Sequence, residues 1–227
     1  MGRVMLLGGA RETEMAADAL TGARHAVRVY WSRDPATHDV TPCASLRDGL
    51  SWANGLLDTT HVFDRNLRAL TRALAPGMPA CRFGRALWQP EFEDRWRSVP
   101  DLPTAVAALP AGARVFAATG RDSAETLGHH DGPVFLRQLH RHDDVPPENC
   151  NFVFGAGPFV AADEARLFAE LDIDVVLARN IGGLGSFPKL EAARALNLPV
   201  ILVEPEALVF GPTVTDLDVV CDWAAGL

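Results

Sequence analysis

The sequence predicts an α/β protein with two domains, each built around a mainly parallel sheet. Three observations lead to this prediction: short apolar runs alternate with helical patterns, glycines follow several of these runs, and a proline-rich stretch interrupts the alternation once. Alternating strands and helices are typical of βαβ units, in which helices cover both faces of a parallel sheet. A chain of 227 residues that is 48% hydrophobic has enough apolar side chains for one large core or two small ones.

The first half of the chain repeats a pattern of strand, turn and helix. An apolar run at 4–7 ends at Gly8 and Gly9, and a helix follows in which apolar side chains share one face. The same patterns predict strands at 26–30 and 56–57 and a helix at 63–75.

The second half continues the pattern, with predicted strands at 114–118, 152–154, 175–178 and 200–203 and helices at 162–171 and 187–196. More than six strands suggest two sheets, and we place the division at the proline-rich residues 89–113. We therefore expect two Rossmann-like domains, 1–105 and 106–227. A ligand would bind in the interdomain cleft, beyond the carboxyl ends of the strands.

Composition and charge exclude several classes of function. A net charge of −8 argues against nonspecific binding to nucleic acid, which requires a basic surface. No apolar run approaches the roughly 18 residues of a membrane span. The run at 4–7 also lacks the pattern of a signal peptide, so we expect a cytoplasmic protein without a membrane partner. The four cysteines are far apart, which favours reduced, buried thiols.

The first glycine turn has two interpretations. Residues 6–14, LLGGARETE, lie between a strand and a helix, where nucleotide-binding folds bind phosphate with backbone N–H groups. The stretch lacks a full GxGxxG pattern, so a simple turn with Glu12 and Glu14 at the start of a helix explains it about equally well. Arg11 is either a phosphate ligand or a solvated side chain.

Ser32 and Arg33 follow the second strand, where dinucleotide-binding folds contact the adenosine ribose. An acidic residue there favours NAD, whereas an arginine accommodates the 2′-phosphate of NADP. These residues therefore favour NADP. An exposed loop arginine is the alternative.

Thr59, Thr60 and His61 follow the short third strand, at the edge of the sheet where a ligand is expected. A histidine there can donate a proton, orient a ligand, or be structural. Three arginines come next at helical spacing: Arg65, Arg68 and Arg72. We expect them to form a solvated basic face rather than a carboxylate-binding one.

Residues 129–144 hold four of the seven histidines and three aspartates. Their spacing matches no structural zinc pattern, and the surrounding residues are typical of loops. We expect solvated loops and no metal site.

Lys189 is the single lysine of the chain. Ser186 and Pro188 predict that it lies in the first turn of a helix, where the macrodipole disfavours a cation. An anionic ligand group would offset this cost.

Six stretches together carry a resemblance to a known family. Along nearly the whole chain they are LLGGARETE, DTTHVFD, DRWRSVPDLPTAVAAL, VFAATGRDS, GAGPFVAADEARLF and RNIGGLGSFPKLEAARALNLPVILVEP. In this combination the sequence resembles the precorrin-6A reductase family. The resemblance implies two Rossmann-like domains, NADPH as hydride donor, and a tetrapyrrole substrate whose reduction gives precorrin-6B in cobalamin biosynthesis. Neighbouring enzymes of the pathway are then candidate partners.

The resemblance and the patterns above select the site residues. The predicted cofactor-binding residues are Gly8, Gly9, Arg11, Glu12, Ser32, Arg33, Thr59, Thr60, Gly120 and Arg121. The predicted substrate-binding residues are Arg137, Arg179, Asn180, Gly182, Gly183 and Lys189. His61 is the candidate proton donor, with ordered water as the substitute.

The sequence departs from the family pattern at four places. Ala10, Val62 and Ile181 stand where the family has threonine or serine, proline, and serine, and the glycine-rich segment between the second and third strands is missing. These departures motivate a second hypothesis, in which a noncatalytic homologue binds a nucleotide or a tetrapyrrole as a carrier or regulator.

Overall fold

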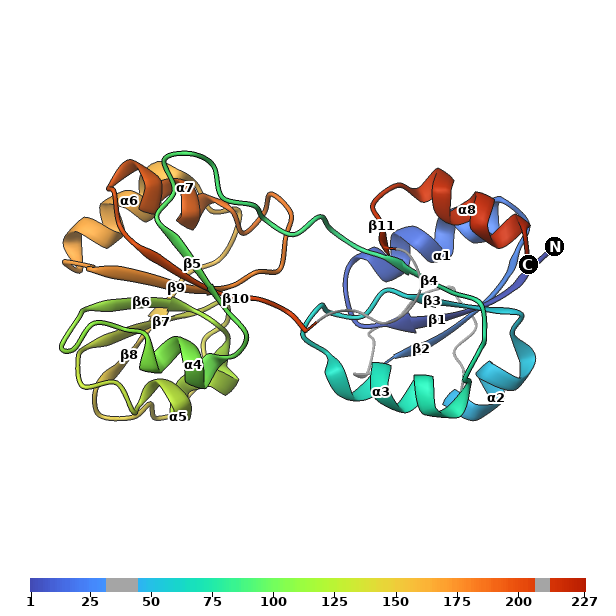
Figure 1. Ribbon diagram of the computed structural model, residues 1–227, viewed down its shortest axis with the longest axis horizontal. Helices are drawn as coiled ribbons and strands as arrows, with labels where there is room; N and C mark the ends of the chain where they lie inside the picture. Colours follow the sequence, from blue (N-terminus) through green and yellow to red (C-terminus); the bar gives the residue numbers. More distant parts are fainter. Residues whose placement is uncertain (32–44, 207–212) are drawn as a thin grey trace. The chain divides into compact units, whose positions relative to one another are not determined.

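The computed structural model describes residues 1–31, 45–206 and 213–227. The chain forms two compact units: unit 1 is Met1–Ala86 together with Ala207–Leu227, and unit 2 is Leu87–Glu206. Each unit has one sheet with helices on both faces (Figure 1), and the strand pairs of both sheets are parallel. The predicted α/β class is confirmed.

Unit 1 has a five-stranded sheet in the order β11-β4-β3-β1-β2. Its strands are β1 (Arg3–Gly8), β2 (Ala26–Trp31), β3 (Gly55–Asp58), β4 (Ala80–Phe83) and β11 (Thr213–Val214). Figure 1 shows helices on both faces of this sheet. They are α1 (Glu12–Gly22) and α8 (Leu217–Ala225) on one face, and α2 (Leu46–Trp52) and α3 (Arg65–Leu74) on the other.

Strand β1 shows why a central strand of this sheet contains a continuous apolar run. Val4 and Leu6 belong to the core that includes residues of α1 and α8, whereas Met5 and Leu7 belong to the core that includes residues of α2 and α3. Neighbouring side chains of a strand point to opposite faces, so a strand covered on both faces needs a continuous apolar run. All four side chains are fully buried.

Unit 2 has a six-stranded sheet in the order β5-β10-β9-β6-β7-β8. Its strands are β5 (Trp96–Val99), β6 (Val115–Ala118), β7 (Val134–Gln138), β8 (Cys150–Phe154), β9 (Val175–Arg179) and β10 (Val200–Val203). Helices α6 (Ala161–Glu170) and α7 (Pro188–Ala195) cover one face. The short helices α4 (Leu102–Ala107) and α5 (Ala124–Leu127) cover the other, and a 3-10 turn, η1 (Arg121–Ser123), leads into α5.

The division of the chain differs from the predicted domains 1–105 and 106–227. The proline-rich stretch contains β5 and α4, and both lie in unit 2 because β5 pairs with β10. Pro103 does not interrupt α4, since it occupies the first turn, where no N–H is needed, and Asp101 caps the helix. At the other end, α8 returns to unit 1, where Val220 and Ala224 complete the core on the α1 face.

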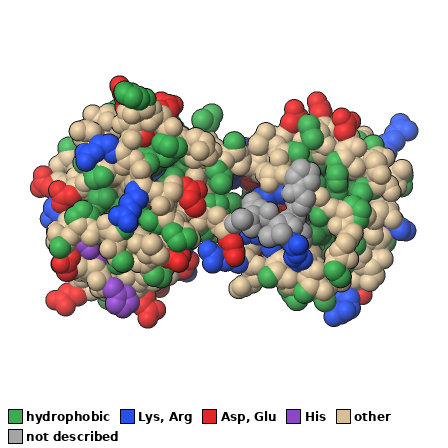
Figure 2. Space-filling model, viewed as in Figure 1, with side chains coloured by type: hydrophobic (Ala, Val, Ile, Leu, Met, Phe, Trp, Pro, Cys, Tyr) green, Lys and Arg blue, Asp and Glu red, His purple; other side chains and the backbone are tan. Residues whose placement is uncertain are grey.

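Charged side chains of both signs cover the surface. Figure 2 shows acidic and basic side chains interspersed over the visible face of each unit, in a chain whose net charge is −8. In the described part of the chain, no helix combines the length and the apolar character that crossing a membrane would require.

The turn before β7 is tightly packed, and Gly132 tests this. A Cβ at Gly132 would lie 2.4 Å from the carbonyl oxygen of Ala113, a backbone atom that cannot swing away. Gly132→Ala should lower the free energy of unfolding by about 1–3 kcal/mol in urea denaturation. Gly22→Ala is the matched control, because a Cβ there meets nothing within 4 Å. Equal effects of the two substitutions would contradict this packing.

Candidate functional site

The loops at the carboxyl edge of each sheet carry the candidate site residues. In unit 1 these loops follow β1 and β3, and in unit 2 they follow β6, β7 and β9. Because all strands of a parallel sheet end at the same edge, loops far apart in the sequence come together there, and open α/β sheets bind ligands at this edge. Each unit is described by itself below.

The glycine turn after β1 is fixed by contacts within the protein. A Cβ at Gly8 would lie 2.7 Å from the ring of Trp31, so glycine is required there by the indole. The N–H of Gly9 donates to the hydroxyl of Thr13, which lies 2.9 Å from the hydroxyl of Thr59. Thr59 is fully buried and also donates to the carbonyl of Leu7. The turn is therefore rigid where it enters α1.

Glu12 and Arg85 form an ion pair at the start of α1. The guanidinium of Arg85 donates to both carboxylate oxygens of Glu12, at 2.5 and 3.2 Å. Burial would raise the pKa of Glu12, but the hydrogen bonds from Arg85 outweigh it, and the pKa lies below its ordinary value. Glu12 is thus ionised and balanced by a cation, whereas Arg11 is exposed.

Asp58 is a buried carboxylate at the end of β3. One of its oxygens accepts hydrogen bonds from the backbone N–H and the hydroxyl of Thr60, at 2.9 and 2.7 Å. The other accepts from Arg82, at 2.6 Å. Arg82 also donates to the carbonyl of Thr60, so one ion pair fixes the backbone just ahead of His61. Two buried partners satisfy each other here, which is what an ionised group needs in an apolar interior.

Arg68 holds the next two residues of the same loop. Its guanidinium donates to the hydroxyl of Thr60 and to the carbonyl oxygens of His61 and Val62, at 3.0, 3.1 and 2.8 Å. The expectation of a solvated basic face is therefore wrong for Arg68, which is 8% exposed. Its guanidinium replaces water as the partner of loop carbonyls.

His61 itself is exposed at this edge. Its Nδ1 accepts a hydrogen bond from the backbone N–H of Phe63 at 3.3 Å. In the neutral ring this hydrogen bond places the proton on Nε2. The centroids of the His61 and Phe63 rings lie 6.2 Å apart. The loop is rigid while the imidazole reaches solvent, which suits a group that transfers a proton.

The loops after β6 and β9 of unit 2 are joined by an ion pair. Arg179 donates to both carboxylate oxygens of Asp122, at 2.8 and 3.3 Å. Gly120 has a φ of 90°, and a Cβ there would lie 2.7 Å from Asp122 and 3.2 Å from Arg179. Arg121 pairs with Asp144 at 3.0 Å and is more than half exposed.

Asn180 and Trp88 pair through hydrogen bonds inside unit 2. The side-chain oxygen of Asn180 accepts the N–H of Trp88 at 2.9 Å, and its amide nitrogen donates to the carbonyl of Trp88 at 3.1 Å. The same nitrogen donates to Glu204 at 3.0 Å. Asn180 is fully buried, and Gly182 and Gly183 follow it with φ values of 68° and 73°, which favour glycine.

Arg137, Glu164 and Lys189 form a buried charged cluster. Arg137 donates to Glu164 at 2.7 Å and stacks over Phe159, with its guanidinium carbon 4.6 Å from the ring centroid. Among the described residues, the Nε of Arg137 has no hydrogen-bond partner. Lys189 donates to the carbonyl of Ser186. The three side chains together carry one excess positive charge at less than 10% exposure.

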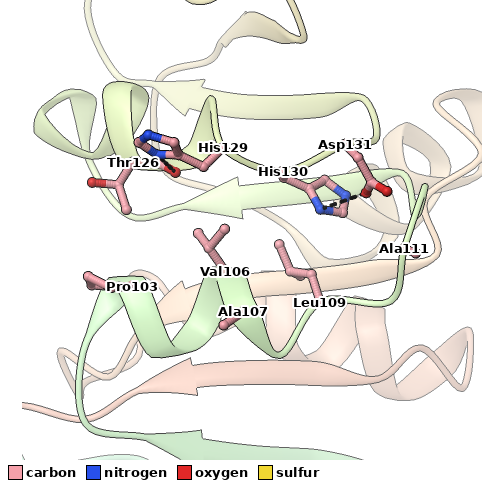
Figure 3. Close-up of a pocket in the computed structure, with 9 residues that line it drawn as sticks. All are labelled: Pro103, Val106, Ala107, Leu109, Ala111, Thr126, His129, His130 and Asp131. Atoms are coloured by element: carbon pink, nitrogen blue, oxygen red, sulfur yellow. Dashed lines mark hydrogen bonds and ion pairs between the residues drawn. The ribbon is translucent and has the colours of Figure 1, made fainter.

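The histidine-rich stretch lies at both ends of β7, with His129 and His130 before the strand and His140 and His142 after it. His130 is buried, its Nε2 donates to the carbonyl of Ala113 over 2.8 Å, and its ring lies 3.5 Å from Asp131. Figure 3 shows His129 and His130 on the opposite side of a cavity from Val106 of α4 and from Leu109, which follows this helix. The cavity has a volume of about 580 Å³. Asp131 and Ala111 in its wall precede β7 and β6, so this cavity belongs to the amino ends of the strands. We place the functional site at the polar carboxyl edges instead.

No group of three or more histidine, cysteine, aspartate or glutamate side chains within the described ranges is arranged to hold a metal ion. The prediction of solvated histidines is wrong for His130, whose ring donates to a backbone carbonyl, and for His142, whose ring packs edge-on against Phe152 and Phe154. Two predicted cofactor residues, Ser32 and Arg33, lie outside the described residues.

Sequence reasoning missed four residues that the structure brings to these edges: Arg82, Arg85, Trp88 and Glu164. Arg82 and Arg85 lie in and just after β4, a strand that the apolar pattern does not predict because ACRF places an arginine in it. If the sequence pattern had predicted β4, both arginines would have been expected at the carboxyl edge of the sheet.

Two doubly wound parallel sheets with polar, glycine-containing loops at their carboxyl edges define a protein of the Rossmann-like α/β class. Residues 3–225 match the family model described as Precorrin-6x reductase CbiJ/CobK, and the chain belongs to this family.

Individual relatives agree with this family. The chain is 37% identical over 187 residues to a precorrin-6A reductase of Rhodobacter capsulatus, covering 79% of this chain and 72% of the relative. It is 31% identical over 236 residues to that of Sinorhizobium sp, covering 95% and 90%. A solved structure of CobK precorrin-6A reductase superposes with a TM-score of 0.82 at 30% identity, covering 100% of this chain and 97% of that one.

Lys189 makes stability depend on pH. Burial lowers its pKa to about 8, with Glu164 opposing this shift and Arg137 adding to it. Between that value and the ordinary 10.5, the unfolded chain binds more protons than the folded one, so the free energy of unfolding should rise with pH across this window. Lys189→Met should abolish the rise.

Below pH 8 the Lys189→Met variant should be more stable than the wild type by up to about 3 kcal/mol, at 1.36 kcal/mol for each pKa unit. Urea denaturation from pH 7 to 10 measures both effects. Arg166→Met, at an exposed position of α6, is the control for loss of a cation. A wild-type profile that stays parallel to that of Lys189→Met would contradict the burial of a charged ammonium.

Proposed function

We propose that the protein reduces precorrin-6A to precorrin-6B with NADPH, in the biosynthesis of cobalamin. The observation that carries this proposal is the family match over residues 3–225, supported by relatives that bear the name precorrin-6A reductase. The arrangement of polar loops at two carboxyl edges supports it too, because a cofactor and a large substrate each need a binding surface.

Unit 1 is the proposed NADPH-binding unit. Gly8 and Gly9 connect β1 to α1, and the first turn of a helix offers backbone N–H groups to phosphate. The carboxylate of Glu12 would repel a phosphate, but Arg85 neutralises it and adds a cation at the same place. Arg11 is exposed beside this turn. These residues fit a dinucleotide.

Adenosine recognition would come from Ser32 and Arg33, which follow β2 in the sequence. The positive charge of Arg33 suits the 2′-phosphate that distinguishes NADPH from NADH. NADPH, when bound, supplies the hydride.

Unit 2 is the proposed substrate-binding unit, since its edge combines cations with exposed apolar side chains. Arg121 follows β6, and Arg179 is the last residue of β9, so both lie at this edge. Guanidinium groups bind carboxylates well. Leu139 after β7 is 57% exposed, and Leu184 after β9 is 88% exposed. A tetrapyrrole with an apolar ring and several carboxylates requires this combination.

His61 is the proposed proton donor. Reduction of a double bond takes up one hydride and one proton, and the exposed imidazole stands on a loop that Arg68 and Arg82 hold by its carbonyls. The arginines act only through this loop. Their contribution would be to keep the ring in one position relative to the substrate.

Anaerobic incubation with precorrin-6A and NADPH tests the function. We expect a product heavier by two hydrogen atoms, and a lower KM for NADPH than for NADH. Arg33→Ala should narrow this difference, because the 2′-phosphate loses a charged partner. Equal KM values in the wild type would contradict NADPH as the cofactor. Tight binding of the tetrapyrrole with no reduction would favour the noncatalytic carrier or regulator that Ile181 and the missing glycine segment suggest.

Removing the imidazole tests the proton donor. His61→Asn should lower kcat by about 10²- to 10⁴-fold, the usual contribution of general acid catalysis, and leave the KM values nearly unchanged. Steady-state assays and a solvent isotope effect measure this. His129→Asn, an exposed histidine remote from the edge, should leave kcat unaltered. Wild-type kcat in His61→Asn would assign the proton to ordered water.

A further inference from the structure

The loop between β9 and α7, residues 181–187, contains three glycines within four positions. We call it the glycine loop. Gly182 and Gly183 adopt positive φ values, and Leu184 is exposed. A glycine-rich segment loses much conformational entropy when it is ordered, so contacts elsewhere must hold it in one conformation.

Trp88 supplies contacts from one side. Its indole Nε1 donates to the carbonyl of Gly183 at 2.7 Å, and its ring lies 6.0 Å from the ring of Phe187, at the end of the loop. The backbone of Trp88 is itself fixed by both atoms of the Asn180 amide. The indole is therefore a rigid donor that reaches the middle of the loop.

Lys189 supplies further contacts to the loop and to Trp88. Its ammonium donates to the carbonyl of Ser186 and lies 5.0 Å from the centroid of the Trp88 ring, within range of a cation–π contact. The charged groups that face it are Glu164 from α6 and Arg137 from β7. The side chain is 9% exposed, so its two close partners are parts of the loop and of the tryptophan that holds the loop.

We propose that Trp88 and Lys189 are positioning residues that hold the glycine loop in the conformation that binds the tetrapyrrole, and that the charged form of Lys189 is the one that holds it. This inference rests on the proposed function, because it takes unit 2 as the substrate-binding unit. It assigns Lys189 an indirect role in place of the direct contact with an anion that its position in the helix suggests.

The charge of Lys189 is costly at its position in the fold, but its contacts depend on that charge. A cation in the first turn of α7 opposes the macrodipole, and burial adds a desolvation cost. The charged ammonium makes a stronger hydrogen bond to Ser186 than the neutral amine, and the neutral amine has no cation–π attraction to Trp88. Loss of the proton should therefore weaken the hold on Ser186 directly and the hold on Gly183 through Trp88.

Two substitutions test the hold on the loop. Trp88→Phe keeps an aromatic ring and removes the donor to Gly183, and Lys189→Met keeps the apolar stem and removes the ammonium. Each should raise the KM for the tetrapyrrole about tenfold, the equivalent of one hydrogen bond, with kcat and the KM for NADPH nearly unchanged. Hydrogen–deuterium exchange should quicken in residues 181–187 and remain at wild-type rates in β6 and β9.

Matched controls separate this role from general packing. Trp96→Phe makes the same change on β5, in the same core of unit 2, and Arg166→Met removes an exposed cation of α6. Because neither removes the donor to Gly183 or the ammonium at Ser186, both should leave the KM and the exchange of residues 181–187 at wild-type values. Faster exchange throughout unit 2 in Trp88→Phe and Lys189→Met would overturn the proposal in favour of a purely structural role.

A pH series supplies a readout that packing alone would not change. The KM of the wild type for the tetrapyrrole should rise as the pH increases through about 8, where burial places the pKa of Lys189. In Lys189→Met the KM should be high and show no such step. The same step in both proteins would overturn the role of the charge. A wild type that neither binds nor reduces the tetrapyrrole would sink the proposed function, whereas the exchange comparison would still decide whether these residues hold the loop.

Discussion

The parallel pairing of the strands is the constraint on which the rest of the structure depends. In both sheets the strands run in one direction, so their carboxyl ends, and the loops that follow them, share one edge. This brings Glu12 within hydrogen-bonding distance of Arg85, 73 residues later, and Asp122 next to Arg179, 57 residues later. Polar groups that would be costly in the two-sided apolar core are thereby concentrated where water and ligands can reach them.

Buried charges at these edges fix loops at the expense of stability. Asp58 and Arg82 satisfy each other, and their bonds to Thr60 set the path of the backbone before His61. Lys189 is different, because its main partner is a carbonyl and its pKa is lowered by burial. A buried ion pair is weak evidence for stability but can impose one conformation on its surroundings. Both arrangements favour order in loops over a maximal free energy of unfolding.

Sequence patterns predicted the apolar elements well and the polar contacts poorly. The run at Val4–Leu7 and the helix after it follow from periodicity alone, and the edge position of His61 follows from the strand before it. Strand β5 and helix α4 were hidden by prolines, one of which fits the first helical turn. Gly8 and Gly120 are among the predicted cofactor-binding residues, but Trp31, Asp122 and Arg179 occupy the space beside them. Such partners lie far along the chain, and local patterns do not contain them.

The return of α8 to unit 1 has a consequence for synthesis of the chain. Val220 and Ala224 of α8 share a core with Val4 and Leu6 of β1. Residues 1–86 therefore cannot complete this core until α8 has left the ribosome. Unit 2 is continuous from Leu87 to Glu206 and can form earlier. The usual order of domain folding during translation, with the N-terminal domain first, is therefore reversed, and part of one apolar sheet face of the nascent first unit stays uncovered until α8 is synthesised.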